Sequence, residues 1–129
     1  MHPISELLCD AYSELYKQNQ VKFPLYEEQK VAIDSVVKTV HATYFGFERY
    51  PTPIDKAVAY LCLIIKDHVV TDGNKRLAIL WFRIYCVVNK LEVINPDPKL
   101  DVLAVAIEKE KELSLDKIME LVRKIIFSK

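Results

Sequence analysis

Glycine is scarce in this sequence and occurs only at Gly46 and Gly73. Most turns must therefore form without it, and each glycine marks a place where the backbone needs unusual freedom. Cysteine is also sparse, and Cys9, Cys62 and Cys86 are odd in number and form no C-x-x-C pair. All three fall in apolar helical patterns. We therefore expect buried, reduced thiols rather than disulfides or metal ligands.

Net charge is absent as well. The 18 basic and 18 acidic residues cancel, so no overall field would draw the chain to nucleic acid or to an anionic membrane. The N-terminus shows no basic stretch followed by an apolar run, and the long apolar segment near the middle is broken at Arg83. That segment is too short to span a bilayer. These absences predict a cytoplasmic protein that binds neither nucleic acid nor membranes.

Helical periodicity covers most of the chain. A length of 129 residues and a hydrophobic fraction of 51% fit a single globular domain over residues 1–129. Apolar residues recur at helical spacing over 4–15, 27–43, 53–66, 75–89, 98–110 and 114–125, and this spacing turns Leu7, Val31 and Ile125 inward. No alternating pattern is long enough for a useful strand. We expect an all-α bundle of about six helices.

Two of these helices carry almost no polar face. They cover residues 57–66 and 75–89, and helices that are apolar all round belong at the centre of a bundle. The first begins at a clear signal, with Thr52 as N-cap and Pro53 in the first helical position. Just before it, Phe45–Pro53 holds three aromatics, two prolines and a glycine. We expect these aromatics to fold back on the core; the alternative is a surface edge for a partner chain.

The loop between the two central helices, His68–Arg76, is the most chemically dense part of the sequence. Lys75 and Arg76 open a helix at the end where the dipole disfavours cations, which costs a few tenths of a kcal/mol each unless an anion binds there. Free backbone N–H groups and the flexible Gly73 would complete an anion site. The alternative is an ordinary turn in which Asn74 caps the helix. The charges favour the anion site.

Two further residues of this loop suit chemistry on a nucleotide. His68 can be a neutral base at cell pH. Asp72 would be repelled by a bound phosphate unless a divalent cation bridged them, which indicates Mg²⁺. The Walker pattern G-x-x-x-x-G-K-[ST] is absent. A zinc site would need more ligands than His68, Asp72 and the distant His41.

The segment His68–Arg76 resembles the signature of the Fic/Doc family, roughly H-x-F-x-[DE]-G-N-[GK]-R. Tyr50-Pro51-Thr52 and Lys56-Ala57 look like the family's approach to the preceding helix, and the resemblance covers residues 26–90. It implies transfer of a phosphate-containing group from ATP to a protein hydroxyl. The resemblance makes His68 the general base and Asp72 the Mg²⁺ ligand, while the phosphates would be bound by Gly73, Asn74, Lys75 and Arg76.

Lys75 bears on which group is transferred. Fic proteins that transfer AMP have glycine at this position, whereas lysine resembles Doc, whose relatives transfer the terminal phosphate and act as toxins held by an antitoxin. The resemblance therefore implies a phosphorylating toxin, with AMP transfer as the alternative. Phe45–Pro53 would form the flap that docks the target protein by strand addition. The inhibitory pattern S/T-x-x-x-E-[G/N] of some relatives is absent, so restraint would come from a separate antitoxin.

The sequence departs from the family pattern at two positions. Val70 stands where the signature has phenylalanine, which removes packing volume and would loosen the loop unless Trp81 or Phe82 fills the gap. Leu77 stands where Doc-like members commonly have threonine. Neither change touches a residue with a proposed chemical role. They leave open a further alternative, a catalytically degenerate module that binds nucleotide or protein.

Overall fold

The structure is a computed structural model that describes residues 1–93 and 99–127. These residues form six helices and one small hairpin. The elements are α1 (Pro3–Lys17), α2 (Glu27–Val40), β1 (Thr43–Tyr44), β2 (Phe47–Glu48), α3 (Pro53–Asp67), α4 (Asn74–Val88), α5 (Lys99–Lys109) and α6 (Leu115–Phe127). The expected all-α bundle is confirmed. The predicted helix start at Asp97-Pro98 lies outside the described residues.

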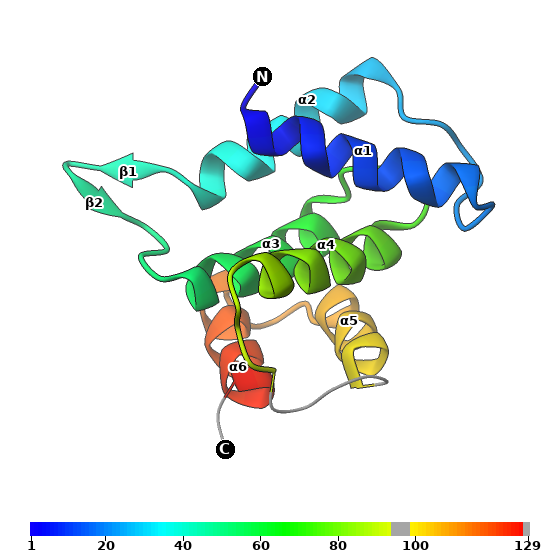
Figure 1. Cartoon of the computed structure of the whole chain (residues 1–129). Coiled ribbons are helices and arrows are strands. Elements are labelled where there is room, and N and C mark those ends of the chain that lie inside the picture. Colours follow the sequence, from blue (N-terminus) through cyan, green and yellow to red (C-terminus); the bar gives the residue numbers. More distant parts are fainter. Residues whose placement is uncertain (94–98, 128–129) are drawn as a thin grey trace.

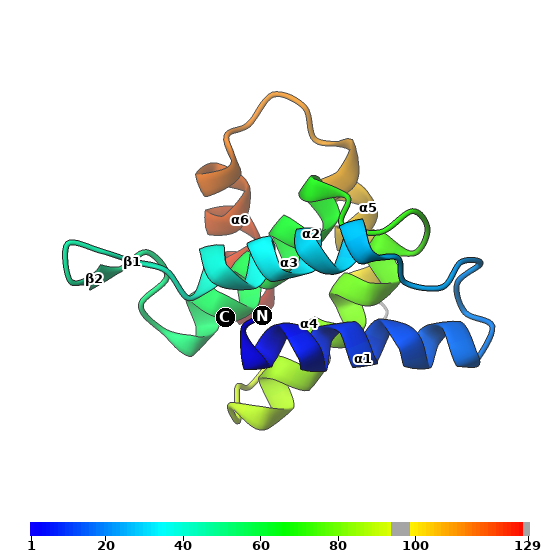
Figure 2. The same cartoon turned by 90° about the horizontal axis from the view of Figure 1, so that it is seen from above.

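The helices are arranged in three layers. In Figure 1, α1 and α2 lie on one side, α3 and α4 in the middle, and α5 and α6 on the other side. Figure 2 shows α1 and α2 side by side above the middle layer. All residues of α3 from Lys56 to Ile65 are buried, which confirms that this helix is the centre of the bundle. The outer side of α4 is exposed at Val87 and Val88, so α4 is central on one side only.

The predicted start of α3 is confirmed in detail. Thr52 Oγ1 accepts a hydrogen bond from the backbone N–H of Asp55 at 3.1 Å, and Pro53 is the first helical residue. The helix predicted over 27–43 ends earlier, at Val40, because the chain enters the hairpin at Thr43. Phe45 and Gly46 form its two-residue turn with φ of 51° and 82°. A turn with positive φ at both central positions suits the twist of the two hairpin strands.

Three residues predicted to point inward are exposed. Leu7, Val31 and Ile125 have exposed fractions of 58%, 69% and 46%. Val31 lies about 200° around α2 from the buried Ile33, because successive helical residues turn by about 100°. Ile126 takes the buried place at the end of α6. The pattern located the helices but misjudged which of their apolar residues are buried.

The hairpin projects from the bundle rather than folding onto it (Figure 1). Phe45 and Phe47 are 101% and 77% exposed, whereas Tyr50 is 7% exposed. The expectation that these aromatics fold back is therefore wrong for the two phenylalanines and right for Tyr50. Buried Lys56 holds the base, where its Nζ donates to Glu48 Oε1 at 3.1 Å and to the Tyr50 carbonyl.

Two expectations about the whole chain can be compared with the structure. Cys9, Cys62 and Cys86 are free and buried, as predicted. None of the helices within residues 1–93 and 99–127 combines the length and apolarity needed to cross a bilayer.

Candidate functional site

The loop between α3 and α4 is held by its own Asn74. This residue opens α4 and is 6% exposed. Its Oδ1 accepts from the N–H of Val70 at 3.0 Å, and its Nδ2 donates to the carbonyl of Val70 at 2.8 Å. The same Nδ2 lies 3.3 Å from Nδ1 of His68. Because both ends of the amide serve the loop, Asn74 fixes the loop's shape and orients the histidine.

Two residues of the loop have left-handed backbone. His68 ends α3 with φ 48°, and Gly73 precedes α4 with φ 87°. Glycine is required at position 73 for a second reason, since a Cβ there would lie 2.3 Å from Cγ1 of Val21. Gly73, not Asn74, is the N-cap residue of α4. The scarcity of glycine in the sequence correctly marked this position.

The segment between α1 and α2 closes over one side of the loop. Asp72 Oδ2 accepts from the backbone N–H of Lys22 at 3.1 Å. Thr71 Oγ1 accepts from Nε2 of Gln29 at 2.5 Å, and the same amide caps α2 by accepting from the N–H of Tyr26 at 3.0 Å. The buried Gln29 thus links the start of α2 to the loop. Asp72 and Thr71 are thus held in place by residues that lie about 40 to 50 positions away in the sequence.

Lys75 and Arg76 point to different sides of α4, toward α5 and toward the segment between α1 and α2. Arg76 Nη1 donates to Gln20 Oε1 at 2.5 Å, on the side of the α1–α2 segment. Lys75 Nζ lies 3.1 and 3.0 Å from the two carboxylate oxygens of Glu108 on α5. Consecutive helical residues diverge by about 100°. The structure therefore does not bring the two predicted phosphate-binding cations together.

An open hollow of about 770 Å³ lies beside Asp72 and Arg76. Its other walls are mostly polar residues of the end of α1 and the segment that follows, with Lys17 and Lys22 among them. His68 and Lys75 are not among the lining residues. The predicted metal ligand and one predicted phosphate ligand thus share a hollow, while the predicted base contacts Asn74, the first residue of α4.

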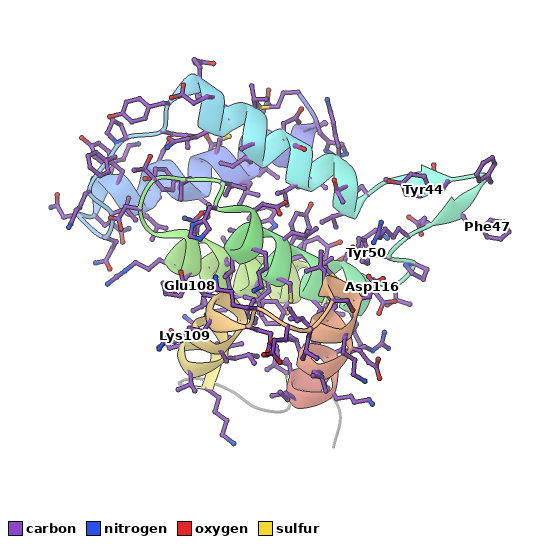
Figure 3. The ribbon with its side chains drawn as sticks, turned by 180° about the vertical axis from the view of Figure 1, so that it is seen from behind. Tyr44, Phe47, Tyr50, Glu108, Lys109 and Asp116 are labelled. Atoms are coloured by element: carbon purple, nitrogen blue, oxygen red, sulfur yellow. The ribbon has the colours of Figure 1, made fainter. Side chains whose placement is uncertain are left out.

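The side of the loop that faces α5 has its own electrostatics. The hydrogen bond from Lys75 is the main cause that lowers the pKa of Glu108, and the charges of Lys75 and His68 lower that pKa further. Glu108 lies at the end of α5 nearest the loop (Figure 3). Next to His68, burial raises the pKa of Asp67. The carboxylate of Glu108 therefore interacts with Lys75 directly and with His68 through charge.

Comparison with known proteins identifies the family of this chain. The model of the family described as Fic/DOC matches residues 3–86. The chain belongs to the Fic/Doc family. It is also similar to Toxin Doc of Mycolicibacterium smegmatis, with 41% identity over 46 residues, which is 36% of this chain and 35% of that protein. The match thus spans about a third of the relative's length. No solved structure matches the chain.

The two departures from the Fic/Doc signature have a structural setting. Val70 is 3% exposed, and Asn74 pairs with both its N–H and its carbonyl. The loop is thus fixed through the backbone of Val70 as well as through its smaller side chain. Leu77 is fully buried and its N–H donates to the carbonyl of Gly73 at 2.9 Å. A leucine suits this place because a hydroxyl buried there would need a partner.

Several residues that contact the Fic/Doc loop were not predicted from the sequence. Gln20, Val21 and Lys22 lie in a segment that reads only as a polar break between helices. Gln29 resembles any polar residue in a helical first turn. Glu108 lies outside the matched residues 3–86, and nothing in α5 distinguishes it from its acidic neighbours. No local signal marks these residues, because each matters only through a distant contact.

Proposed function

We propose that this chain is a Doc-like toxin that transfers the terminal phosphate of ATP to a hydroxyl of a target protein. One observation carries the proposal: Asn74, the first residue of α4, contacts His68, while Asp72 and Arg76, two residues before and after Asn74, border an open hollow. A base for the acceptor and a cationic site for the donor thus flank the same helix start. The similarity to Toxin Doc and the lysine at position 75 favour phosphate transfer.

The chain's own residues divide the proposed reaction. His68 takes the proton of the target hydroxyl, whose oxygen then bonds to the terminal phosphorus as the bond to the bridging oxygen breaks and ADP leaves. Asn74 keeps the imidazole in place. Arg76 and the free N–H groups at the start of α4 bind the phosphates. Asn74 itself acts on the loop, because its side-chain amide is already paired with Val70.

The residues at the hollow fit a Mg²⁺ ion that is bound together with a nucleotide. Among the described residues, no group of three or more His, Cys, Asp or Glu side chains could hold a metal ion. Asp72 offers one carboxylate at the hollow, and Mg²⁺ in nucleotide sites commonly takes one or two carboxylates together with phosphate oxygens. Asp72 would hold the ion, which would neutralise charge on the phosphates.

The proposal is tested by labelling. The purified protein, Mg²⁺ and a lysate are incubated with ATP labelled at the γ or the α phosphate. We expect γ label on a protein band and its loss in His68→Ala and Asp72→Asn. Asp101→Asn, at an exposed position of α5, is the matched control for the lost charge and should keep activity. Label transferred from α-labelled ATP would show that AMP, not phosphate, is transferred. Labelling by the wild-type protein that does not exceed labelling by His68→Ala would refute the proposal that the chain is an enzyme.

An antitoxin partner belongs to the same proposal, since the similar protein is named a toxin. An apolar groove of about 690 Å³ between α1 and α4 suits it, with Leu7 and Ile84 on its walls. Asp10 and Glu14 also line this groove, so a partner helix with an apolar face and basic flanks would be complementary. A candidate antitoxin should co-purify with the tagged chain and be lost with Ile84→Glu. Retention by that variant would place the partner elsewhere.

A further inference from the structure

Lys75 is the motif residue whose charge is already satisfied inside the molecule. Both oxygens of Glu108 lie within hydrogen-bonding distance of its Nζ. The two side chains are 39% and 32% exposed, so the pair is half-buried and less screened by water than a surface pair. The contact joins the start of α4 to the end of α5, 33 residues later in the chain. It brings a carboxylate to the helix start where an anion is proposed to bind.

From this geometry we infer that Glu108 is a positioning residue that sets the anion affinity of the loop by holding Lys75. The inference rests on the proposed function for its relevance to ATP. A phosphate at the start of α4 can gain Lys75 only if the ammonium leaves Glu108 or shares its charge between the two anions. In both cases the carboxylate weakens binding of the phosphate. Arg76 points toward the segment between α1 and α2 and keeps its own partner, Gln20.

The electrostatics of Glu108 support the inference that it acts through Lys75. The pKa of Glu108 is lowered chiefly by the hydrogen bond from Lys75, in line with the two short contacts between the side chains. Lys109, its neighbour, is exposed and its charge acts on Glu108 more weakly than that of Lys75 or His68. A purely structural tie between α4 and α5 would not need a residue of the phosphate-binding motif as one partner.

The test measures binding with two probes, inorganic pyrophosphate and Mg²⁺-ATP, by titration calorimetry. Glu108→Gln removes the charge and keeps the shape of the side chain. We expect about tenfold tighter binding of both probes, which corresponds to about 1.4 kcal/mol, and a steeper loss of affinity with salt because one more cation meets the phosphate. Glu112→Gln is the matched control, because Glu112 is exposed and its substitution removes the same charge. It should leave both affinities unchanged.

A double-mutant cycle shows whether Glu108 acts through Lys75. Lys75→Met removes the cation at similar length. We expect the gain from Glu108→Gln to disappear in the Lys75→Met background. An equal gain in both backgrounds, or unchanged or weaker binding by Glu108→Gln alone, would overturn the inference. Thermal melts of each variant separate these results from unfolding.

The two probes separate failure of the inference from failure of the proposed function. Tighter pyrophosphate binding by Glu108→Gln without any ATP binding would support the role of Glu108 and refute the nucleotide function. ATP binding that Glu108→Gln does not strengthen would support the nucleotide function and refute the role of Glu108. Absence of binding by either probe to any variant would refute both.

Discussion

Gly73→Ala should destabilise the protein much more than Gly46→Ala, although both glycines have similar backbone. Their φ angles are 87° and 82°, so each alanine carries about the same strain of roughly 1–2 kcal/mol in the left-handed region. Both also gain the same small benefit from a stiffer unfolded chain. These contributions cancel when the two variants are compared.

The difference arises from what the new methyl group meets. At position 46 no atom lies within 4 Å of the added Cβ, whereas at position 73 it would lie 2.3 Å from Cγ1 of Val21. Val21 is 5% exposed, so it cannot simply swing into solvent. Overpacking of this kind costs about 1–3 kcal/mol. We therefore expect a total loss of about 2–5 kcal/mol for Gly73→Ala and about 1–2 kcal/mol for Gly46→Ala.

Urea unfolding followed by circular dichroism measures both losses, with equal m-values as the condition for comparing them. Val21→Ala provides the internal check. In that background, Gly73→Ala should lose its excess cost, because the clashing methyl group is gone. Equal destabilisation by the two glycine substitutions, or an excess that persists with Val21→Ala, would show that the segment after α1 does not pack on the loop as the structure has it.

Three other changes follow from single contacts. Asn74→Ala should cost about 2–4 kcal/mol in urea unfolding, because it leaves the N–H and carbonyl of Val70 buried without partners; a loss below 1 kcal/mol would contradict the clamp. Burial, the main cause, and the charges of His2 and Lys56 lower the pKa of His41 in the folded state. The unfolded chain therefore binds more protons below about pH 6.5, and stability should fall as the pH drops through that value towards the folded pKa; His41→Gln should flatten the curve, and an unchanged slope would contradict this assignment. Lys56→Met should speed proteolysis within the hairpin relative to wild type, because it removes the donor to Glu48 and Tyr50; equal cleavage rates would mean that the base is held by other contacts.

The helices and the motif were predictable from the sequence because both are local features. Apolar spacing located six helices, and Thr52-Pro53 marked the start of α3 to the residue. Gly73 stood out because glycine is so rare. Local pattern failed where it had to tell which apolar residues of a helix are buried: Val31 lies on the exposed face of α2, and Ile125 lies just outside the buried stripe of α6.

The surroundings of the loop were not predictable for a different reason. Hydrophobic spacing shows which face of a helix is buried but not which segment covers it. The contacts of Asp72 with Lys22 and of Lys75 with Glu108 join residues 50 and 33 positions apart. The prediction from the sequence placed Lys75 and Arg76 at the same phosphate site because they are neighbours in the chain. On a helix, neighbours diverge, and the structure assigns them to two sides.

The hairpin lies far from His68. It joins the start of α3, whereas His68 follows the end of the same helix, and Figure 1 shows the hairpin pointing away from the bundle. The 15 residues of α3 separate the two places by about 22 Å at 1.5 Å per residue. An extended chain covers this distance in about seven residues. If a target pairs with the hairpin, as the resemblance to the family implies, and His68 is the base, the docking strand and the hydroxyl that receives the phosphate must be separate parts of the target, about seven or more residues apart.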